Sequence, residues 1–202
     1  FGGAEANVAV SLANFGLNSA LVTKIPQNDI TKAAVKDLRG YNVDVSNIVH
    51  GGDRLGIYFI EKGASQRGSK VIYDRKYSSI SMAKREDFDW NKIFESATWF
   101  HFTGITPALS DSVAEICLDA CKCAKEKGLT ISCDLNYRKN LWSTEKAGQV
   151  MGELMKYVDL CIANEEDAEK VFGIKAKNTD VETGKLNHEG YREVAEQLAS
   201  RF

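Results

Sequence analysis

The stretch Asp134-Leu-Asn-Tyr-Arg138-Lys-Asn-Leu-Trp142 directly follows the apolar run Leu129-Thr-Ile-Ser-Cys133. The apolar run predicts a buried strand, and a helix is predicted to begin near Ser143. The stretch offers a carboxylate, an amide, a phenol and a guanidinium within five residues. In an open α/β sheet, ligands bind beyond the carboxyl ends of the strands. The stretch therefore predicts an α/β fold with a ligand site where this strand gives way to a helix.

Helical and strand-like runs alternate along the whole chain. This alternation predicts an α/β fold in which a mostly parallel central sheet carries helices on both faces. The predicted helices cover 4–15, 31–39, 112–127, 143–157, 165–172 and 189–202, and the predicted strands cover 19–25, 43–50, 97–103, 129–134 and 159–163.

Local signals set several of these boundaries. Ser112 and Glu115 have the spacing of a capping box for the helix over 112–127. The segment 178–187 is polar and rich in turn residues, which predicts a loop. No strand is predicted after the helix over 189–202, so we expect the chain to be a fragment in which the last αβ unit is incomplete.

Two strand-like runs, 55–62 and 70–76, interrupt the alternation. Glycine and serine residues between them predict a hairpin. We interpret residues 51–80 as a small β lid, with residues 1–50 as the first part of an α/β core and residues 81–202 as its continuation.

The composition excludes several classes of protein. Hydrophobic residues make up 44% of the 202 residues, and the formal net charge of -2 does not suggest a nucleic-acid surface. No apolar run approaches the roughly 20 residues that span a bilayer. The five cysteines are an odd number and stand mostly in apolar runs, which favours reduced thiols and a cytoplasmic protein. We interpret Cys117, Cys121 and Cys123 as small apolar residues rather than zinc ligands.

The segment Gly2-Gly3-Ala4-Glu5-Ala6-Asn7 opens the first predicted helix. Glycines allow a ligand to approach the backbone closely, and the N–H groups of a first helical turn bind hydroxyls or anions. The alternative is a glycine-rich helix start with Asn7 in solvent. The segment is not the G-x-G-x-x-G dinucleotide fingerprint, and the chain contains no G-x-x-x-x-G-K-[ST] phosphate loop.

The two lid strands carry Tyr58, Tyr73 and Arg75. Residues at i and i+2 share a face of a strand, so Tyr73 and Arg75 are expected on the same side. An arginine beside a phenol suits the bidentate binding of a carboxylate. The alternative is a solvated hairpin face.

Two further strand ends carry polar groups. Gly104 follows a predicted strand and would let a ligand lie against the backbone, whereas His101 is interpreted as a core or sheet histidine. Glu166 and Asp167 stand in the first turn of the helix over 165–172. They could bind Mg²⁺ through waters, or they could only complement the helix dipole.

Taken in order, these segments resemble the ribokinase-like carbohydrate kinases, the PfkB family, over nearly the whole chain. The resemblance implies transfer of the ATP γ-phosphoryl group to a primary hydroxyl of 2-keto-3-deoxygluconate. A keto acid would explain why both the lid and the core supply an arginine; fructose, the alternative sugar, needs fewer cations. The segments are Gly2 to Asn7, Tyr58, Tyr73 to Arg75, Gly104 to Pro107, Asp134 to Trp142, and Asn164 to Asp167.

The resemblance also implies roles for single residues. Arg138 would lie between sugar and nucleotide and stabilise the transferred charge. The sugar acid would further contact Gly3, Ala4, Glu5, Ala6, Asn7, Tyr58, Tyr73, Arg75 and Ile105; the nucleotide would contact Asn136, Tyr137, Arg138 and Asn164; and Mg²⁺ would bind indirectly at Glu166 and Asp167. Asp167 stands where the family motif Asn-x-x-Glu has its glutamate. Lids of this family often pair between subunits, which implies a homodimer through the lid.

The family's Gly-Ala-Gly-Asp element, which supplies the anion hole and the catalytic base, does not follow Asp167. We therefore assign no catalytic base, and we expect the segment alone to be inactive. The alternatives from other classes are a non-catalytic sugar-binding or regulatory domain and, less favoured, a nucleotide-binding oxidoreductase domain.

Overall fold

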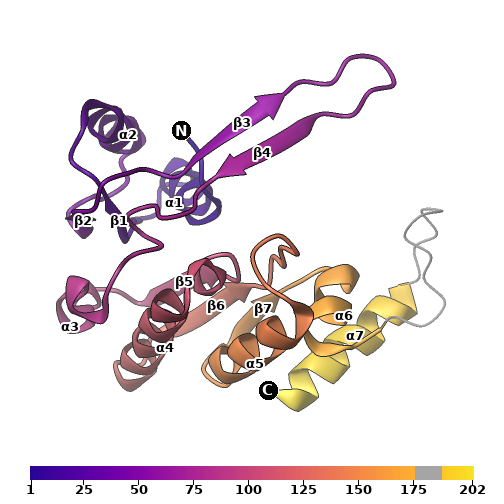
Figure 1. Cartoon of the computed structure of the whole chain (residues 1–202). Helices are drawn as coiled ribbons and strands as arrows, with labels where there is room; N and C mark the ends of the chain where they lie inside the picture. Colours follow the sequence, from indigo (N-terminus) through magenta and orange to yellow (C-terminus); the bar gives the residue numbers. More distant parts are fainter. Residues whose placement is uncertain (176–187) are drawn as a thin grey trace. The chain divides into compact units, whose positions relative to one another are not determined.

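The computed structural model describes residues 1–175 and 188–202, which form two units, Phe1–Phe88 and Asp89–Phe202 (Figure 1). The loop predicted over 178–187 lies outside the described residues. The first unit contains both the predicted segment 1–50 and the lid, and the second contains most of the predicted continuation of the core. None of the helices in the described ranges is long and apolar enough to cross a membrane.

The first unit begins with two helices and a small parallel sheet. The strands β1 (Thr23–Ile25) and β2 (Ile48–His50) pair in parallel, with Lys24 opposite Val49. Between Ser19 and Val22 the only strand-like pairing is an isolated bridge from Ala20 to Asp44, so the strand predicted over 19–25 is shorter than expected. The helices are α1 (Ala4–Asn14) and α2 (Asp29–Gly40).

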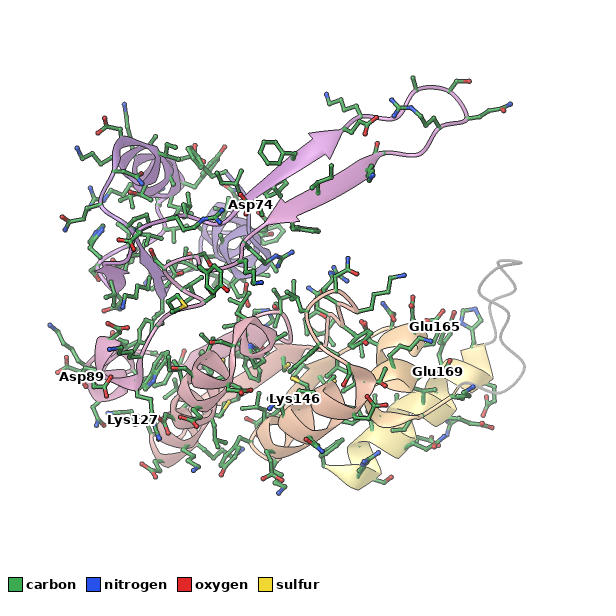
Figure 2. The ribbon with its side chains drawn as sticks, viewed as in Figure 1. Asp74, Asp89, Lys127, Lys146, Glu165 and Glu169 are labelled. Atoms are coloured by element: carbon green, nitrogen blue, oxygen red, sulfur yellow. The ribbon has the colours of Figure 1, made fainter. Side chains whose placement is uncertain are left out.

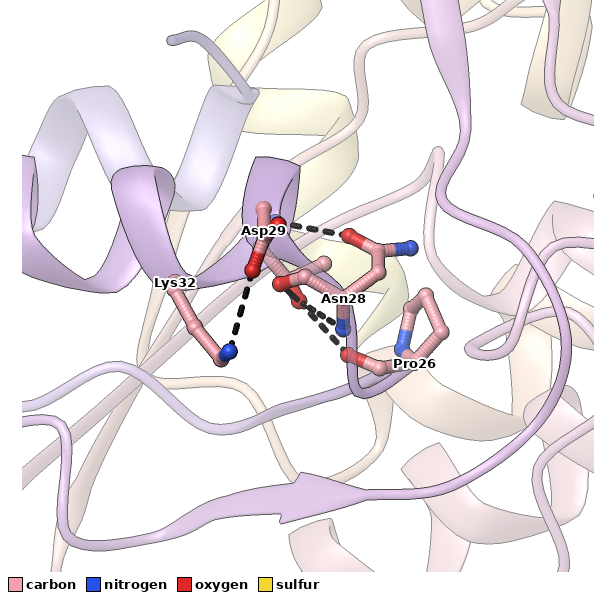
Figure 3. Close-up of polar contacts among 5 residues, drawn as sticks. Pro26, Asn28, Asp29 and Lys32 are labelled. Carbon is pink, nitrogen blue, oxygen red and sulfur yellow. Dashed lines mark hydrogen bonds and ion pairs between the residues drawn. The ribbon is translucent and has the colours of Figure 1, made fainter.

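A reciprocal cap starts α2 two residues before the predicted boundary (Figure 3). The side chain of Asn28 accepts a hydrogen bond from the Thr31 backbone N–H at 2.9 Å, and the Asn28 N–H donates back to Thr31 Oγ1 at 3.2 Å. The Thr31 hydroxyl also lies 2.7 Å from the carbonyl oxygen of Pro26, and Lys32 pairs with Asp29 at 3.0 Å. The Asn28 side chain thereby satisfies one of the N–H groups that a first helical turn otherwise leaves unpaired.

The predicted hairpin is confirmed. Its strands β3 (Ile57–Glu61) and β4 (Lys70–Asp74) are antiparallel, with Tyr58 opposite Tyr73. Every residue of both strands is exposed, and the hairpin projects away from the helices of its own unit (Figure 1). A short 3₁₀ helix, Arg85–Asp87, lies near the end of this unit, where Asp87 pairs with Lys24 at 2.6 Å.

The second unit contains a three-stranded parallel sheet in the order β5-β6-β7. The central strand β6 packs against α4, and α4 also packs against α5 (Figure 1). The predicted strands and helices of this unit are confirmed with small changes at their ends. They are β5 (Trp99–Thr103), α4 (Asp111–Glu126), β6 (Thr130–Asp134), α5 (Thr144–Met155), β7 (Leu160–Ile162), α6 (Glu165–Phe172) and α7 (His188–Arg201). The short helix α3 (Trp90–Ile93) and the 3₁₀ helix Pro107–Leu109 were not predicted.

The predicted capping box at Ser112 and Glu115 is wrong. The residue that caps α4 is Ser110, whose hydroxyl accepts a hydrogen bond from the Val113 N–H at 3.3 Å. Ser110 has an extended backbone after the 3₁₀ helix, as a capping residue requires. Ser112 therefore lies inside the first turn of the helix.

The core of the second unit surrounds β6. Ile131 and Cys133 of this strand are fully buried, as are Ala120 and Cys121 of α4 and Met151 of α5. Burial raises the pKa of the Cys121 thiol to about 12. Cys117 is also buried, so the interpretation of these helix cysteines as apolar residues is confirmed for Cys117 and Cys121.

Candidate functional site

The start of α1 lies against the lid within the first unit. A Cβ added to Gly2 would stand 2.5 Å from the phenolic oxygen of Tyr58, so a larger residue would require the tyrosine side chain to move. Gly3 has a φ of 149°, a backbone conformation that favours glycine, and its carbonyl accepts the first helical hydrogen bond from Asn7 N–H at 2.8 Å. Glycine at both positions therefore brings a helix N-terminus to a lid tyrosine.

The lid brings its predicted residues together. The rings of Tyr58 and Tyr73 are 6.3 Å apart, and the Arg75 guanidinium lies 4.0 Å from the centre of the Tyr73 ring. Arg75 stands one residue beyond the end of β4 and not inside the strand, as its predicted range of 70–76 implied. The cation–π contact nevertheless holds Arg75 on the same side as Tyr73.

The residues of the first helical turn differ in exposure. Ala4, Glu5 and Ala6 are half-buried, whereas Asn7 is exposed. The two tyrosines, the arginine and the N–H groups of this turn together offer ring surface, a cation and donors. Such a set can bind a small polyhydroxylated anion.

In the second unit, the stretch after β6 is fixed by hydrogen bonds to its backbone. The carboxylate of Asp134 accepts from the Asn136 N–H at 3.1 Å, and Asn136 has a φ of 39°, in the left-handed region. The Tyr137 N–H donates to Asp167 Oδ1 at 2.9 Å, and the Tyr137 hydroxyl donates to the carbonyl of Trp142 at 3.3 Å. The predicted ligand stretch is therefore a shaped loop, anchored to α6 through Asp167.

Arg138 follows this anchored segment and is exposed, with its guanidinium 3.1 Å from the carbonyl oxygen of Tyr137. Asn164 is the N-cap of α6, and its amide oxygen accepts from the Asp167 N–H at 2.8 Å. The structure thus brings Asn136, Tyr137, Arg138, Asn164 and Asp167 into one group within the second unit.

Asp167 is 7% exposed, whereas Glu166 is exposed. Burial raises the pKa of Asp167, and the Asp134 carboxylate adds to the rise; hydrogen bonds from backbone N–H groups and the charge of Arg138 oppose it. Among residues 1–175 and 188–202 no group of three or more His, Cys, Asp or Glu side chains could hold a metal ion. The Asp167 carboxylate is directed at the Tyr137 backbone, and binding of Mg²⁺ through waters stays a prediction.

Gly104 has a different role from the predicted one. A Cβ at this position would stand 2.1 Å from the carbonyl oxygen of Leu135, and the Gly104 N–H donates to the carbonyl of Asp134 at 2.8 Å. The chain itself therefore fills the space that we expected a ligand to use. The neighbouring Ile105 is half-buried, and its N–H donates to Thr103 Oγ1 at 3.3 Å.

His101 is a sheet histidine, as predicted. Its Nδ1 lies 2.8 Å from the hydroxyl of Ser132, which also accepts from Trp99 Nε1 at 2.8 Å. Ser132 is 3% exposed, so the histidine takes part in a buried contact between neighbouring strands.

Comparison with known proteins identifies the family. The pfkB family carbohydrate kinase model matches residues 1–198. The crystal structure of 2-dehydro-3-deoxygluconokinase from Thermotoga maritima is 54% identical, has a TM-score of 0.94, and the match covers 100% of this chain and 60% of that one. The 2-dehydro-3-deoxygalactonokinase of Haloferax volcanii is 35% identical over 170 residues, or 84% of this chain and 53% of that protein. An uncharacterized sugar kinase from Pyrococcus horikoshii, solved in complex with ATP, is 28% identical with a TM-score of 0.74, covering 85% of this chain and 56% of that one.

The chain thus spans between half and two thirds of the length of these relatives. The predicted ribokinase-like α/β fold is confirmed, with parallel strands between helices and a small antiparallel pair. This chain belongs to the pfkB family of carbohydrate kinases.

Proposed function

We propose that this chain is part of an ATP-dependent kinase that phosphorylates 2-keto-3-deoxygluconate. The observation that carries the proposal is the lid arginine, Arg75, stacked on Tyr73 in the unit where Tyr58 touches Gly2. A guanidinium on one lid tyrosine, together with a helix N-terminus that contacts the other lid tyrosine, matches a substrate with a carboxylate at one end and hydroxyls along its length. The likeness to a 2-dehydro-3-deoxygluconokinase supports the same substrate.

The reaction needs residues that bind the sugar acid and residues that bind the nucleotide. We assign the lid and α1 of the first unit to the sugar acid, and the residues after β6 and β7 of the second unit to the nucleotide. Arg75 binds the carboxylate of the sugar acid, while the tyrosines and the first turn of α1 hold its hydroxyls. Asn136, Tyr137 and Asn164 contact the nucleotide. ATP, when bound with Mg²⁺, supplies the phosphoryl group; we keep Glu166 and Asp167 as the residues predicted to bind Mg²⁺ through waters.

Arg138 neutralises negative charge during the transfer. The primary hydroxyl oxygen forms a bond to the γ-phosphorus while the bond to the β-phosphate oxygen breaks and ADP leaves. Charge spreads over the phosphoryl oxygens in the transition state, and the exposed guanidinium of Arg138 is a planar cation with several donors for such oxygens. The hydroxyl proton passes to a base that we do not assign to any residue of this chain.

Because no base is assigned, we infer that this 202-residue chain by itself does not turn over ATP. The measurement is ADP release by the isolated chain with 2-keto-3-deoxygluconate, beside the intact protein. ADP release by the intact protein would favour the kinase over a non-catalytic sugar-binding domain. Substrate-dependent release by the isolated chain would contradict the inference.

The substrate is tested by thermal unfolding of the intact protein with each of two sugars. A ligand that binds only the folded state raises the melting temperature. We expect 2-keto-3-deoxygluconate to raise it and fructose to leave it unchanged at the same concentration. Stabilisation by fructose alone would support the alternative, fructokinase, and would overturn the proposed substrate.

We further propose that two copies pair through the outer face of the lid, defined by Ile57, Phe59 and Ile72. Alternation along the paired strands puts these side chains on the face opposite Tyr58 and Tyr73. They are 42%, 58% and 49% exposed, an unusual exposure for three adjacent large apolar side chains. Phe59→Lys should shift the intact protein toward monomer in sedimentation, and an unchanged mass would contradict the pairing.

A cytoplasmic location stays a prediction from the cysteines.

A further inference from the structure

The guanidinium of Arg54 makes three contacts at the base of the lid, two with the last residue of β4 and one with a residue just beyond it. It donates to the carbonyl of Lys76 at 3.0 Å and to the carbonyl of Asp74 at 3.1 Å, and it pairs with the Asp74 carboxylate at 2.7 Å. Figure 2 shows Asp74 at the end of the hairpin nearest the helices of its own unit. The two carbonyls belong to the residues that directly precede and follow Arg75.

The backbone of Arg54 is also fixed. Its carbonyl accepts from both the N–H and the hydroxyl of Ser79, at 2.8 and 3.1 Å. Ser79 is 2% exposed and lies so close to Gly52 that a Cβ there would stand 2.5 Å from the Ser79 hydroxyl oxygen. Gly52 has a φ of 79°, which also favours glycine. Arg54 therefore ties the chain before β3 to the chain after β4 through its main chain as well as its side chain.

These contacts determine where Arg75 stands. Its neighbours on both sides are held by one guanidinium, and its own carbonyl accepts from the Ser78 N–H at 3.2 Å. Gly56 leaves space beside it, since a Cβ at Gly56 would lie 3.3 Å from the Arg75 Cβ. The backbone of Arg75 is thus fixed on both sides while its side chain lies on the Tyr73 ring.

We propose that Arg54 is a positioning residue that orients Arg75 for the substrate carboxylate. This inference rests on the proposed function, in which Arg75 binds that carboxylate. The hairpin needs such support because an isolated two-stranded ribbon is only marginally stable and both its strands are exposed. A guanidinium suits the task because its planar fork can donate to two carbonyls and a carboxylate at once, whereas the three donors of an ammonium all lie on one nitrogen.

The test measures kcat and KM of the intact protein for 2-keto-3-deoxygluconate in four variants: Arg54→Ala, Arg54→Lys, Arg75→Ala and the double variant Arg54→Ala/Arg75→Ala. Loss of a charged hydrogen-bonding group from a binding site typically weakens binding by about 10- to 100-fold, which we expect for KM in Arg75→Ala. We expect Arg54→Ala to raise KM about 3- to 10-fold with kcat nearly unchanged. The KM of Arg54→Lys should lie between the KM of Arg54→Ala and that of the unchanged protein.

We expect the double variant to have the same KM as the single variant Arg75→Ala. The reason is that Arg54 acts through Arg75, so the effects of the two substitutions on KM are not additive. The matched control is Arg67→Ala, which removes another lid arginine, paired with Glu61 and the Lys62 carbonyl near the hairpin tip. Its KM should not change. A role for Arg54 in folding alone would lower the melting temperature and leave the KM of the folded protein unchanged.

The outcomes separate this inference from the function on which it rests. An unchanged KM in Arg75→Ala would overturn the proposal that Arg75 binds the substrate carboxylate, and with it the role of Arg54. A raised KM in Arg75→Ala together with an unchanged KM in Arg54→Ala would overturn only the role of Arg54. If the increase in KM of the double variant equalled the product of the two single increases, the role of Arg54 alone would likewise be overturned. If Arg54→Ala does not fold, the role of Arg54 is tested by the KM of Arg54→Lys, which should be raised. A KM of Arg54→Lys equal to that of the unchanged protein would overturn the inference.

Discussion

Every residue of the hairpin strands β3 and β4 is exposed, whereas every residue of β6 is buried or half-buried. Both regions are rich in the apolar and β-branched residues that favour strands. The strand β6 is held by packing on both sides in its sheet and by α4. The strands of the hairpin are not covered in this way by the residues that the structure describes. Burial accounts for the apolar residues of β6, and we propose that binding accounts for those of the hairpin.

The largest expected effect contrasts one isoleucine from each region. Ile131 of β6 is fully buried and Ile60 of β3 is 56% exposed. Ile131→Ala should lower the free energy of unfolding of the intact protein by about 3 to 4 kcal/mol, because it removes buried methyl groups and leaves a cavity. Ile60→Ala should change it by less than about 0.5 kcal/mol. Urea unfolding measures both values, and equal losses would contradict the contrast between the two regions.

The next effect concerns how closely the chain packs where β6 meets the ligand stretch. Gly104→Ala should cost about 2 to 3 kcal/mol of unfolding free energy, because the new Cβ would meet the Leu135 carbonyl at 2.1 Å and the backbone must move. The matched control is Gly152→Ala in α5, where a Cβ meets nothing within 4 Å. That change should stabilise by up to about 1 kcal/mol through helix propensity. If both substitutions had the same sign, the close approach at Gly104 would not be decisive.

A third effect should appear in the hairpin as a change in binding and not in folding. Arg75→Ala should weaken binding of 2-keto-3-deoxygluconate by about 1.5 to 2 kcal/mol and should leave binding of a neutral sugar nearly unchanged. The reason is that only the sugar acid carries the carboxylate that the guanidinium binds. Titration calorimetry of the intact protein with each sugar measures both values. Equal losses for the two sugars would argue against the clamp.

How far the sequence could predict these regions depended on the range of the interactions. The helix α6 has the predicted bounds, because its cap at Asn164 and its stop at Gly173, with a φ of 71°, are both local signals. The cap of α4 was misassigned because two serines, Ser110 and Ser112, stand near its start, and the preceding backbone decides between them. Local patterns thus set most elements and left single boundaries open.

Contacts between distant residues could not be predicted. Gly104 was taken for a ligand contact because its partner, Leu135, lies 31 residues further along the chain. Arg54 was missed altogether, since two of its partners are backbone carbonyls 20 and 22 residues away, and carbonyls carry no sequence signature. The contact of Asp167 with the Tyr137 N–H was not predicted either, because it depends on how the ends of two strands meet. Indirect binding of Mg²⁺ by Asp167 stays a prediction.

The smallest expected effect is a pH dependence that separates two ion pairs of the first unit. Burial raises the pKa of Asp87, but hydrogen bonds from the Lys24 side chain and from the Lys84 N–H outweigh the effect of burial. The pKa of Asp87 in the folded protein therefore lies below its ordinary value of 3.8. A carboxylate with a lowered pKa stabilises the fold above its unfolded-state pKa, and this stability is lost as pH falls through the folded-state pKa. Asp87→Asn should therefore cost a few tenths of a kcal/mol at pH 7 and make unfolding less sensitive to acid below about pH 4. The control is Glu61→Gln, which removes the exposed pair with Arg67 in the lid and should change neither value. Urea unfolding of the intact protein between pH 3 and pH 7 compares the variants, and an equal acid sensitivity of Asp87→Asn and the unchanged protein would contradict the role of this pair.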